Sequence, residues 1–153
     1  MDNKKEVSTE TVQKLREETG AGVMDCYKAL TEAKNDFDEA VKIIKEKGFV
    51  KMEHRADRAT GAGCVRSYVH NDRIGVLLEL RAETDFVVRS EPFQNLAREL
   101  TMQIAASAPS TVEELLSQPY IKDESKLVKD ILTEVVAKTG ENITIGQFYR
   151  IEV

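Results

Sequence analysis

An aspartate beside a phenylalanine, Asp85-Phe86, is the pair of residues in this chain whose types and position best suit them to act on another protein. The alternating pattern of Arg73–Leu80 predicts a strand before the pair, and Ser90–Phe93 is typical of a helix start after it. A large aromatic and a carboxylate that project together from such a junction can wedge into a partner and compete for its polar groups. The alternative is structural: Phe86 is buried and Asp85 caps the helix.

The other residues with chemical potential form no catalytic or metal-binding pattern. His54 and His70 are far apart in sequence, and neither has a serine or cysteine nucleophile paired with it. Cys26 and Cys64 lack a second cysteine or a histidine at ligand spacing, so we expect no metal and two reduced thiols. Gly61-Ala62-Gly63 does not lie between a strand and a helix, which excludes a phosphate loop. The sequence therefore favours a binding protein without a cofactor over an enzyme.

Residues 8–48 carry three helical patterns. Ser8 can cap the first helix, and Gly20 and Gly22 supply the turn after it. Apolar residues recur at i, i+3, i+4 and i+7 in the next two helices: Val23, Cys26, Tyr27 and Leu30, then Phe37, Ala40, Val41 and Ile44. The third pattern stops at Gly48. Such a small bundle is only marginally stable by itself.

The period changes after a charged stretch at residues 49–63, which we expect to be a linker or at most a frayed helix. Cys64–His70 and Arg73–Glu83 alternate, and Asn71-Asp72 between them suits a two-residue turn, so a β-hairpin is predicted. Further elements are expected beyond it: helices over 91–107 and 123–139, a helical turn over 112–116 and a final strand over 142–153. The fold class is therefore α+β, with a helical module at 1–50, a linker at 51–63 and an antiparallel three-stranded sheet packed with helices at 64–153.

Alternation also assigns side chains to the faces of the predicted sheet. Five apolar residues of the last strand are expected to share one face: Ile143, Ile145, Tyr149, Ile151 and Val153. Leu77 and Phe148 are expected on the opposite faces of their strands, so both faces of the sheet carry apolar side chains. Because one layer of helices covers only one face, the sequence leaves both a monomer and a homodimer open.

Composition narrows the class of partner. The 153 residues carry a net charge of −5, with both signs mixed along the chain, which disfavours nucleic-acid binding. No apolar stretch approaches the roughly 18 residues of a membrane span. Met1–Glu6 is polar and lacks the apolar centre of a signal peptide, so we expect a cytoplasmic chain. Together with the charge and the absence of an apolar span, this predicts a partner that is neither a membrane nor a nucleic acid.

From about residue 8 to the end, the chain resembles the elongation factor Ts family. Four motifs in the same order carry the resemblance: Leu15–Cys26, His70 with Arg73–Leu77, Thr84–Val87 and Lys138–Ile143. It implies a guanine-nucleotide exchange factor that binds elongation factor Tu, both GDP-bound and nucleotide-free, and promotes GDP release in translation elongation. It also implies that the helical module is ubiquitin-associated-like.

The resemblance assigns roles to seven residues. The segment matching Thr84, Asp85, Phe86 and Val87 enters the nucleotide domain of elongation factor Tu and dislodges its magnesium. The module docks on a helix of that domain through the positions of Arg16, Val23 and Met24. Core packing remains an alternative for Val23, because it shares its predicted stripe with Cys26 and Tyr27.

Two features depart from the family pattern. Tyr27 stands where a lysine is usual, and only about 15 residues join Ala108 to Asp123, where longer members carry a second core half or an insertion. The competing hypothesis is a plain binding module without exchange activity. Exposure of Phe86 distinguishes the two, since a buried Phe86 favours the plain module.

Overall fold

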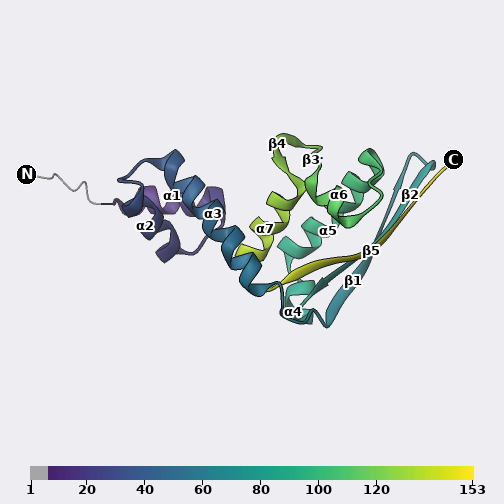
Figure 1. Cartoon of the computed structure of the whole chain (residues 1–153), viewed down its shortest axis with the longest axis horizontal. Helices are drawn as coiled ribbons and strands as arrows, with labels where there is room; N and C mark the ends of the chain where they lie inside the picture. The colour runs from purple at the N-terminus through teal and green to yellow at the C-terminus, as the bar shows by residue number, and fades with distance from the viewer. Residues whose placement is uncertain (1–6) are drawn as a thin grey trace, which may run out of the picture. The chain divides into compact units, whose positions relative to one another are not determined.

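The computed structural model describes residues 7–153 and divides into two units, one ending at His54 and one running from Arg55 to Val153 (Figure 1). The first six residues lie outside the described residues. They comprise the polar N-terminal segment, which does not resemble a signal peptide, and the start of the predicted 1–50 module. In the part of the chain that the structure describes, no helix is long and apolar enough to cross a membrane.

The first unit is the predicted three-helix bundle: α1 (Thr9–Thr19), α2 (Val23–Glu32) and α3 (Phe37–Arg55). Ser8 caps α1 by accepting a hydrogen bond from the backbone N–H of Thr11 at 3.1 Å, and Gly20 ends it with a φ of 67°. The core of this unit consists mainly of small and medium side chains: Val12, Leu15, Ala21, Cys26, Ala29, Leu30, Ala33 and Ala40.

The third helix does not stop at Gly48 as predicted but continues to Arg55. A glycine inside a helix costs about 1 kcal/mol relative to alanine, which is too little to end a helix held by other contacts. Two ion pairs join this helix to α2 on either side of the glycine, Lys47 with Glu32 at 2.6 Å and Lys51 with Asp25 at 2.7 Å. The expected linker is therefore helical over its first part.

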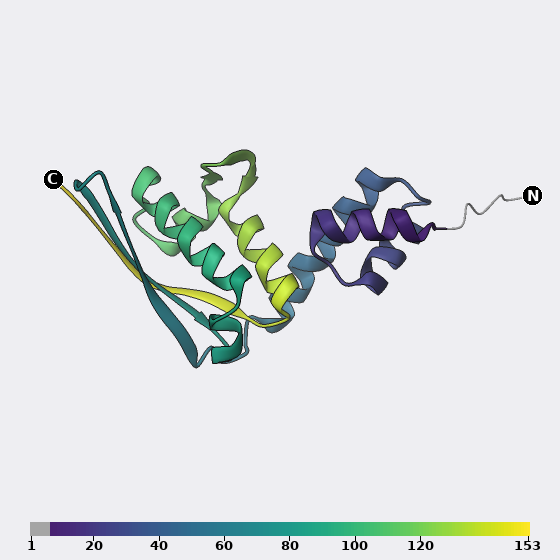
Figure 2. The same cartoon turned by 180° about the vertical axis from the view of Figure 1, so that it is seen from behind.

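The second unit is α+β, as predicted. Its sheet consists of β1 (Ala62–His70), β2 (Ile74–Ala82) and β5 (Ile143–Glu152), antiparallel and in the order β1-β2-β5. The remaining elements are α4 (Asp85–Val88), α5 (Glu91–Ser107), α6 (Val112–Ser117), β3 (Pro119–Tyr120), β4 (Asp123–Leu127) and α7 (Val128–Thr139). The helices of this unit lie on one side of the sheet (Figure 2).

The core of the second unit forms between α5 and the covered face of the sheet. The predicted stripe of α5 is fully confirmed, since all five residues are buried: Phe93, Leu96, Ala97, Leu100 and Ile104. They pack with the buried side chains of β2, which are Val76, Leu78, Leu80 and Ala82. The hairpin turn is one residue longer than predicted, because His70 pairs with Ile74. Asn71 and Asp72 both adopt positive φ there.

The helix predicted over 123–139 begins only at Val128, because residues 123–127 pair with β3 as the strand β4. Asp123 accepts hydrogen bonds from the backbone N–H of Ser125 at 3.1 Å and from its hydroxyl at 2.6 Å. Such local side-chain bonds compete with helical hydrogen bonding. The backbone N–H of Leu127 then donates to Asp130 at 2.8 Å, which starts α7.

A β-bulge in β5 reverses the predicted face of its second half. The register with β2 shifts between Leu78, which pairs with Phe148, and Leu80, which pairs with Ile145. An extra residue in a strand with a period of two moves all later side chains to the other face. Phe148 therefore lies on the covered face, while Tyr149 is 63% exposed on the open one. The predicted common face for Ile143, Ile145, Tyr149, Ile151 and Val153 was wrong.

Candidate functional site: an exposed Asp-Phe tip

The segment from Thr84 to Val88 projects an aromatic side chain from a buried base. Thr84 is extended and caps α4, with its hydroxyl oxygen accepting a hydrogen bond from the backbone N–H of Val87 at 3.4 Å. Within α4, Val87 and Val88 are buried, whereas Asp85 is exposed and Phe86 is 86% exposed. Phe86 is the most exposed large apolar side chain in the described part of the chain.

This geometry contradicts the structural alternative for Asp85-Phe86. Phe86 is not buried, and the side chain that caps the helix belongs to Thr84 and not to Asp85. Val87, which was predicted to contact a partner, is only 6% exposed and anchors α4 in the free protein. We call the exposed pair Asp85 and Phe86 the tip.

The far end of α4 is fastened to the start of α5. The hydroxyl of Ser90 donates to the carbonyl of Val87 at 2.7 Å, and the side-chain amide of Gln94 donates to the carbonyl of Val88 at 2.6 Å. These bonds satisfy carbonyl groups that so short a helix leaves free. The C-terminal end of α4, the helix that carries the tip, is therefore hydrogen-bonded to the start of α5.

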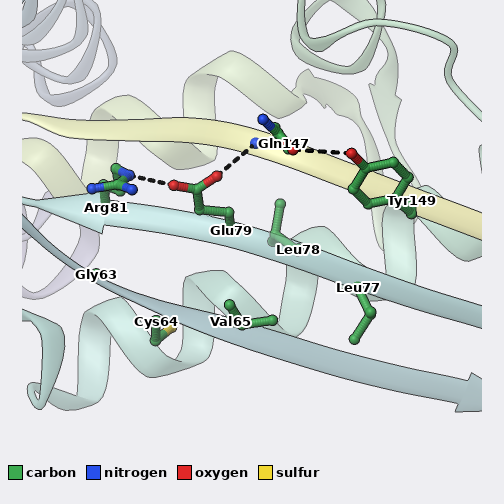
Figure 3. A pocket seen from close by; sticks show the side chains of 9 residues that line it. All are labelled: Gly63, Cys64, Val65, Leu77, Leu78, Glu79, Arg81, Gln147 and Tyr149. Carbon is green, nitrogen blue, oxygen red and sulfur yellow. Dashed lines mark hydrogen bonds and ion pairs between the residues drawn. The ribbon is translucent and has the colours of Figure 1, made fainter.

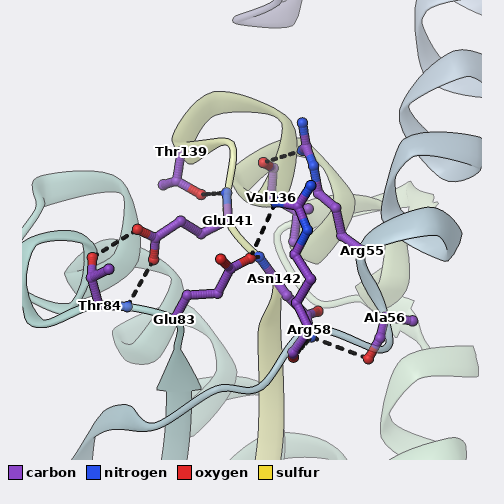
Figure 4. A network of polar contacts seen from close by, with 9 residues as sticks. All are labelled: Arg55, Ala56, Arg58, Glu83, Thr84, Val136, Thr139, Glu141 and Asn142. Carbon is purple, nitrogen blue, oxygen red and sulfur yellow. Dashed lines mark hydrogen bonds and ion pairs between the residues drawn. The ribbon is translucent and has the colours of Figure 1, made fainter.

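A glutamate from the loop between α7 and β5 holds the near end of α4 (Figure 4). One carboxylate oxygen of Glu141 accepts from the backbone N–H of Thr84 at 3.0 Å, and the other accepts from the Thr84 hydroxyl at 2.7 Å. Gly140, with a φ of 74°, ends α7 and allows the chain to reverse before Glu141. The sequence identified the motif Lys138–Ile143 but gave Glu141 no role, because the contact is with a residue far away in the chain.

The next residue, Asn142, joins the same loop to the segment before the sheet (Figure 4). Its buried side-chain amide donates to the carbonyl groups of Ala56 at 3.3 Å and Arg58 at 2.9 Å. Its backbone N–H donates to the Glu83 carboxylate at 2.7 Å, which also pairs with Arg58 at 3.6 Å. Three segments thus meet at the base of the tip.

In the first unit, two of the three predicted docking residues line one groove. Arg16 and Val23 border a depression of about 400 Å³ between α1 and the start of α2, together with Thr9, Val12, Gln13 and Glu17. Val23 is 49% exposed, so core packing does not explain it. Met24 is 64% exposed on the same helix.

Tyr27, which stands where the family usually has a lysine, does not lie in the predicted core stripe of α2. It was expected in the core stripe of α2, but it is 46% exposed, and the buried stripe runs instead through Cys26, Ala29, Leu30 and Ala33. Tyr27 lies three and four residues after Met24 and Val23, which places the three side chains on neighbouring positions of one helical face. We call Val23, Met24 and Tyr27 the α2 ridge.

The open face of the sheet carries a second exposed apolar surface, with a shallow hollow of about 400 Å³ beside the bulge (Figure 3). Glu79 crosses this hollow, bonded to the Arg81 side chain and accepting from the backbone N–H of Gln147 at 3.2 Å. The bond from Gln147 and then the bond from Arg81 lower the pKa of Glu79. Both cysteines have a raised pKa, chiefly through burial, which disfavours reactive thiolates. No cluster of metal-binding side chains occurs in residues 7–153.

Comparison with known proteins decides the family. A family model described as elongation factor TS matches residues 83–153. The chain is 37% identical to elongation factor Ts of Thermodesulfovibrio yellowstonii, over 96% of this chain and 96% of that protein. It is 41% identical to elongation factor Ts of Thermotoga neapolitana, over 97% and 98% of the two chains. This chain belongs to the elongation factor Ts family.

The three relatives named here from the elongation factor Ts family are longer than this chain. The two alignments extend over 191 and 192 positions, more than the 153 residues of this chain, so those relatives contain residues that it lacks. A Clostridium botulinum elongation factor Ts is 45% identical, but the chain spans only 48% of that relative's length. The family-model match begins at Glu83, so it includes the tip, Glu141 and β5.

Proposed function

We propose that this chain is a guanine-nucleotide exchange factor that binds elongation factor Tu in its GDP-bound and nucleotide-free forms and promotes GDP release in the cytoplasm during translation elongation. The observation that carries the proposal is the exposed Phe86 beside Asp85 on an anchored helix, in a chain of the elongation factor Ts family. The names of its relatives support the role in elongation.

The proposed mechanism is binding without covalent chemistry. A factor accelerates release when it binds the distorted GTPase more tightly than the GDP-bound one, because only differential affinity shifts a conformational equilibrium. Phe86 supplies apolar surface that is exposed to water in the free protein, and burying it in a partner is favourable. Asp85 brings a carboxylate that competes for the polar groups holding magnesium and phosphate. GDP is released without any covalent bond being made or broken, so in this proposal the factor is not an enzyme.

The second proposed contact lies in the first unit, where Arg16, Val23 and Met24 face solvent. A groove beside exposed apolar side chains suits an amphipathic helix, which can place apolar residues in the groove and polar ones at its rim. The net charge of −5 agrees with a protein partner and disfavours a nucleic acid. This contact supplies affinity, while the tip supplies the distortion.

The decisive experiment measures release of fluorescent GDP from purified elongation factor Tu, with and without this chain, in the presence of excess unlabelled GDP. We expect the release rate to rise with the concentration of the chain and then to saturate. Binding of the chain without any acceleration would overturn the proposal and favour the plain binding module.

A further inference from the structure

The direction of the tip must be set by residues outside α4. A helix of four residues is a single turn, and isolated turns are unstable because nucleation costs more than one hydrogen bond returns. Burial of Val87 and Val88 fixes one side of this turn. Two backbone N–H groups of α4 also bond to Thr84: that of Val87 to the hydroxyl at 3.4 Å and that of Val88 to the carbonyl at 3.2 Å. The position of Thr84 therefore decides where α4 starts.

Side chains continue the pairing of β2 with β5 beyond its last backbone pair. The last pair of that register is Ala82 with Ile143, and counting on from it places Glu83 opposite Asn142 and Thr84 opposite Glu141. At both positions a carboxylate takes the place of the missing carbonyl partner. Glu83 accepts the backbone N–H of Asn142 at 2.7 Å, and Glu141 accepts the backbone N–H of Thr84 at 3.0 Å. The two carboxylates thus extend the pairing of β2 with β5 by two residues, as far as Thr84, which directly precedes the tip.

Glu141 also orients the hydroxyl of Thr84. Because that hydroxyl donates its proton to Glu141 at 2.7 Å, its oxygen is left as the acceptor for the backbone N–H of Val87. Hydrogen bonds to an ionised carboxylate are stronger than neutral ones. The side chain of Asp85, next to Thr84, is exposed to solvent, so a partner can reach its carboxylate.

We propose that Glu141 is a positioning residue for nucleotide exchange: by holding the N–H and the hydroxyl of Thr84, it sets the direction in which Asp85 and Phe86 leave the core. This inference rests on the proposed function. It requires no contact between Glu141 and the partner, since Glu141 acts through Thr84. Loss of its carboxylate should leave the fold intact and release the start of α4.

The first test uses the free protein. Amide hydrogen exchange of Val87 and Val88 is measured by NMR in the wild type and in Glu141→Gln, with Glu124→Gln as a control that changes an exposed carboxylate of β4. We expect about tenfold faster exchange at both amides in Glu141→Gln, the effect of one lost charge-assisted hydrogen bond, and no change in the control. Thr84→Ser, which keeps both bonding groups, should retain wild-type protection. Unchanged protection in Glu141→Gln would overturn the inference.

The second test asks whether Glu141 acts on exchange through the tip. GDP release from elongation factor Tu is measured for Glu141→Gln, Phe86→Ala and the double variant, at concentrations that keep release above the unassisted rate. We expect Glu141→Gln to slow assisted release about fivefold in the wild type and less than twofold in the Phe86→Ala background. Its effect on the melting temperature should be equal in both backgrounds. An equal rate loss in both backgrounds would show a general structural effect and overturn the positioning role.

The two tests separate this inference from the proposed function. If wild-type protein does not accelerate release, the proposed function fails, and the positioning role in exchange fails with it. If the wild type accelerates release and Glu141→Gln does so equally well, only the positioning role is wrong.

Discussion

Neighbouring residues in α4 have opposite environments, and this contrast defines the site at the scale of single side chains. Phe86 is 86% exposed, while Val87 beside it is buried. The residues of this sequence motif therefore fall into a part that is exposed to solvent and a part that packs in the core. The hydrogen bonds between Thr84 and Glu141 hold the start of the motif.

Replacing Phe86 by alanine should remove most of the exchange activity and leave the fold unchanged. Truncation of an interface anchor commonly costs about 2 kcal/mol or more, which is roughly thirtyfold in rate. Stopped-flow release of fluorescent GDP measures the effect, and circular dichroism checks the fold. Ile121→Ala, another exposed apolar residue, is the control. Equal release rates for Phe86→Ala and the wild type would refute the role of Phe86.

A second residue-scale prediction concerns Tyr120 and Glu99 in the second unit. The Tyr120 hydroxyl donates to Glu99 at 2.6 Å, and Lys122 donates to its other oxygen at 2.6 Å. Burial raises the pKa of Glu99, but the bonds from Lys122 and Tyr120 outweigh it, and the net pKa is lowered. A carboxylate with a lowered pKa stabilises the fold above its unfolded pKa of about 4.3, and this contribution disappears as the pH falls through the folded value.

Tyr120→Phe should therefore lower the free energy of unfolding by about 1 kcal/mol at pH 7, and the difference from the wild type should shrink below about pH 4. Urea unfolding of Tyr120→Phe and the wild type, at pH 7 and at a pH below about 4, measures this difference in the free energy of unfolding. Tyr149→Phe serves as the control, since its hydroxyl bonds an exposed glutamine. A difference that stays constant or grows toward low pH would contradict the assignment to Glu99.

At the scale of elements, the end of β2 carries the tip, and its neighbours β1 and β5 fix where that end lies. Close contact between strands is required at Gly63 of β1, where an added Cβ would lie 2.8 Å from the carbonyl oxygen of Leu80. A Cβ added at Gly75 of β2 would meet no other atom within 4 Å. The two glycines thus differ in the room around them, although both lie in paired strands.

Gly63→Ala should destabilise the protein by about 1–3 kcal/mol, because the clash is with rigid backbone, whereas Gly75→Ala should change stability by less than about 0.5 kcal/mol. Urea unfolding of the two variants and the wild type provides the measurement. Equal stability of Gly63→Ala and Gly75→Ala would show that β1 can move away from β2 without cost.

At the scale of the whole molecule, two units with separate cores carry the two proposed contacts. The boundary lies between His54 and Arg55, a few residues later than the predicted module end at residue 50. Arg55 donates to the carbonyl of Val136 at 3.3 Å, which places it with the second unit. The open face of the sheet adds a third exposed surface, formed by Val65, Val69, Leu77, Tyr149, Ile151 and Val153.

A chain that starts at Arg55 should fold and unfold cooperatively but bind elongation factor Tu much more weakly than the whole chain. The reason is that its core is complete within residues 55–153, while the groove and the α2 ridge are removed. Circular dichroism tests whether the shortened chain folds, and calorimetric titration measures how tightly it binds elongation factor Tu. An unfolded product would mean that the two units depend on a shared core.

Self-association through the open face is the final prediction. A twofold partner is the simplest cover for a row of apolar side chains on a sheet that has helices on its other side. At tens of micromolar, sedimentation equilibrium should show a concentration-dependent mass above the 17.2 kDa of the monomer. Ile151→Glu should restore the monomer, and Ile121→Glu should not. A monomer at all concentrations would reject the dimer.

The sequence by itself determined the features that depend on local pattern. The α+β class, the core stripe of α5 and the helix-sheet junction at Asp85-Phe86 followed from periodicity and from helix-start residues, because these act within a few positions along the chain. The family resemblance rested on four short motifs and was confirmed by relatives that match nearly the whole chain.

Tertiary structure decided what depends on partners far away in sequence. The bulge at Gly146 and Gln147 of β5 moved Phe148 inward, and no local signal of alternation marks an extra residue opposite Glu79. The helix α3 continues past Gly48, where ion pairs join it to α2. Residues 123–127 form a strand because they pair with β3. Glu141 gained its contact with Thr84 only because the end of β2 lies beside the start of β5. Register and long-range hydrogen bonds arise when the strands pair, so a pattern within one segment cannot specify them.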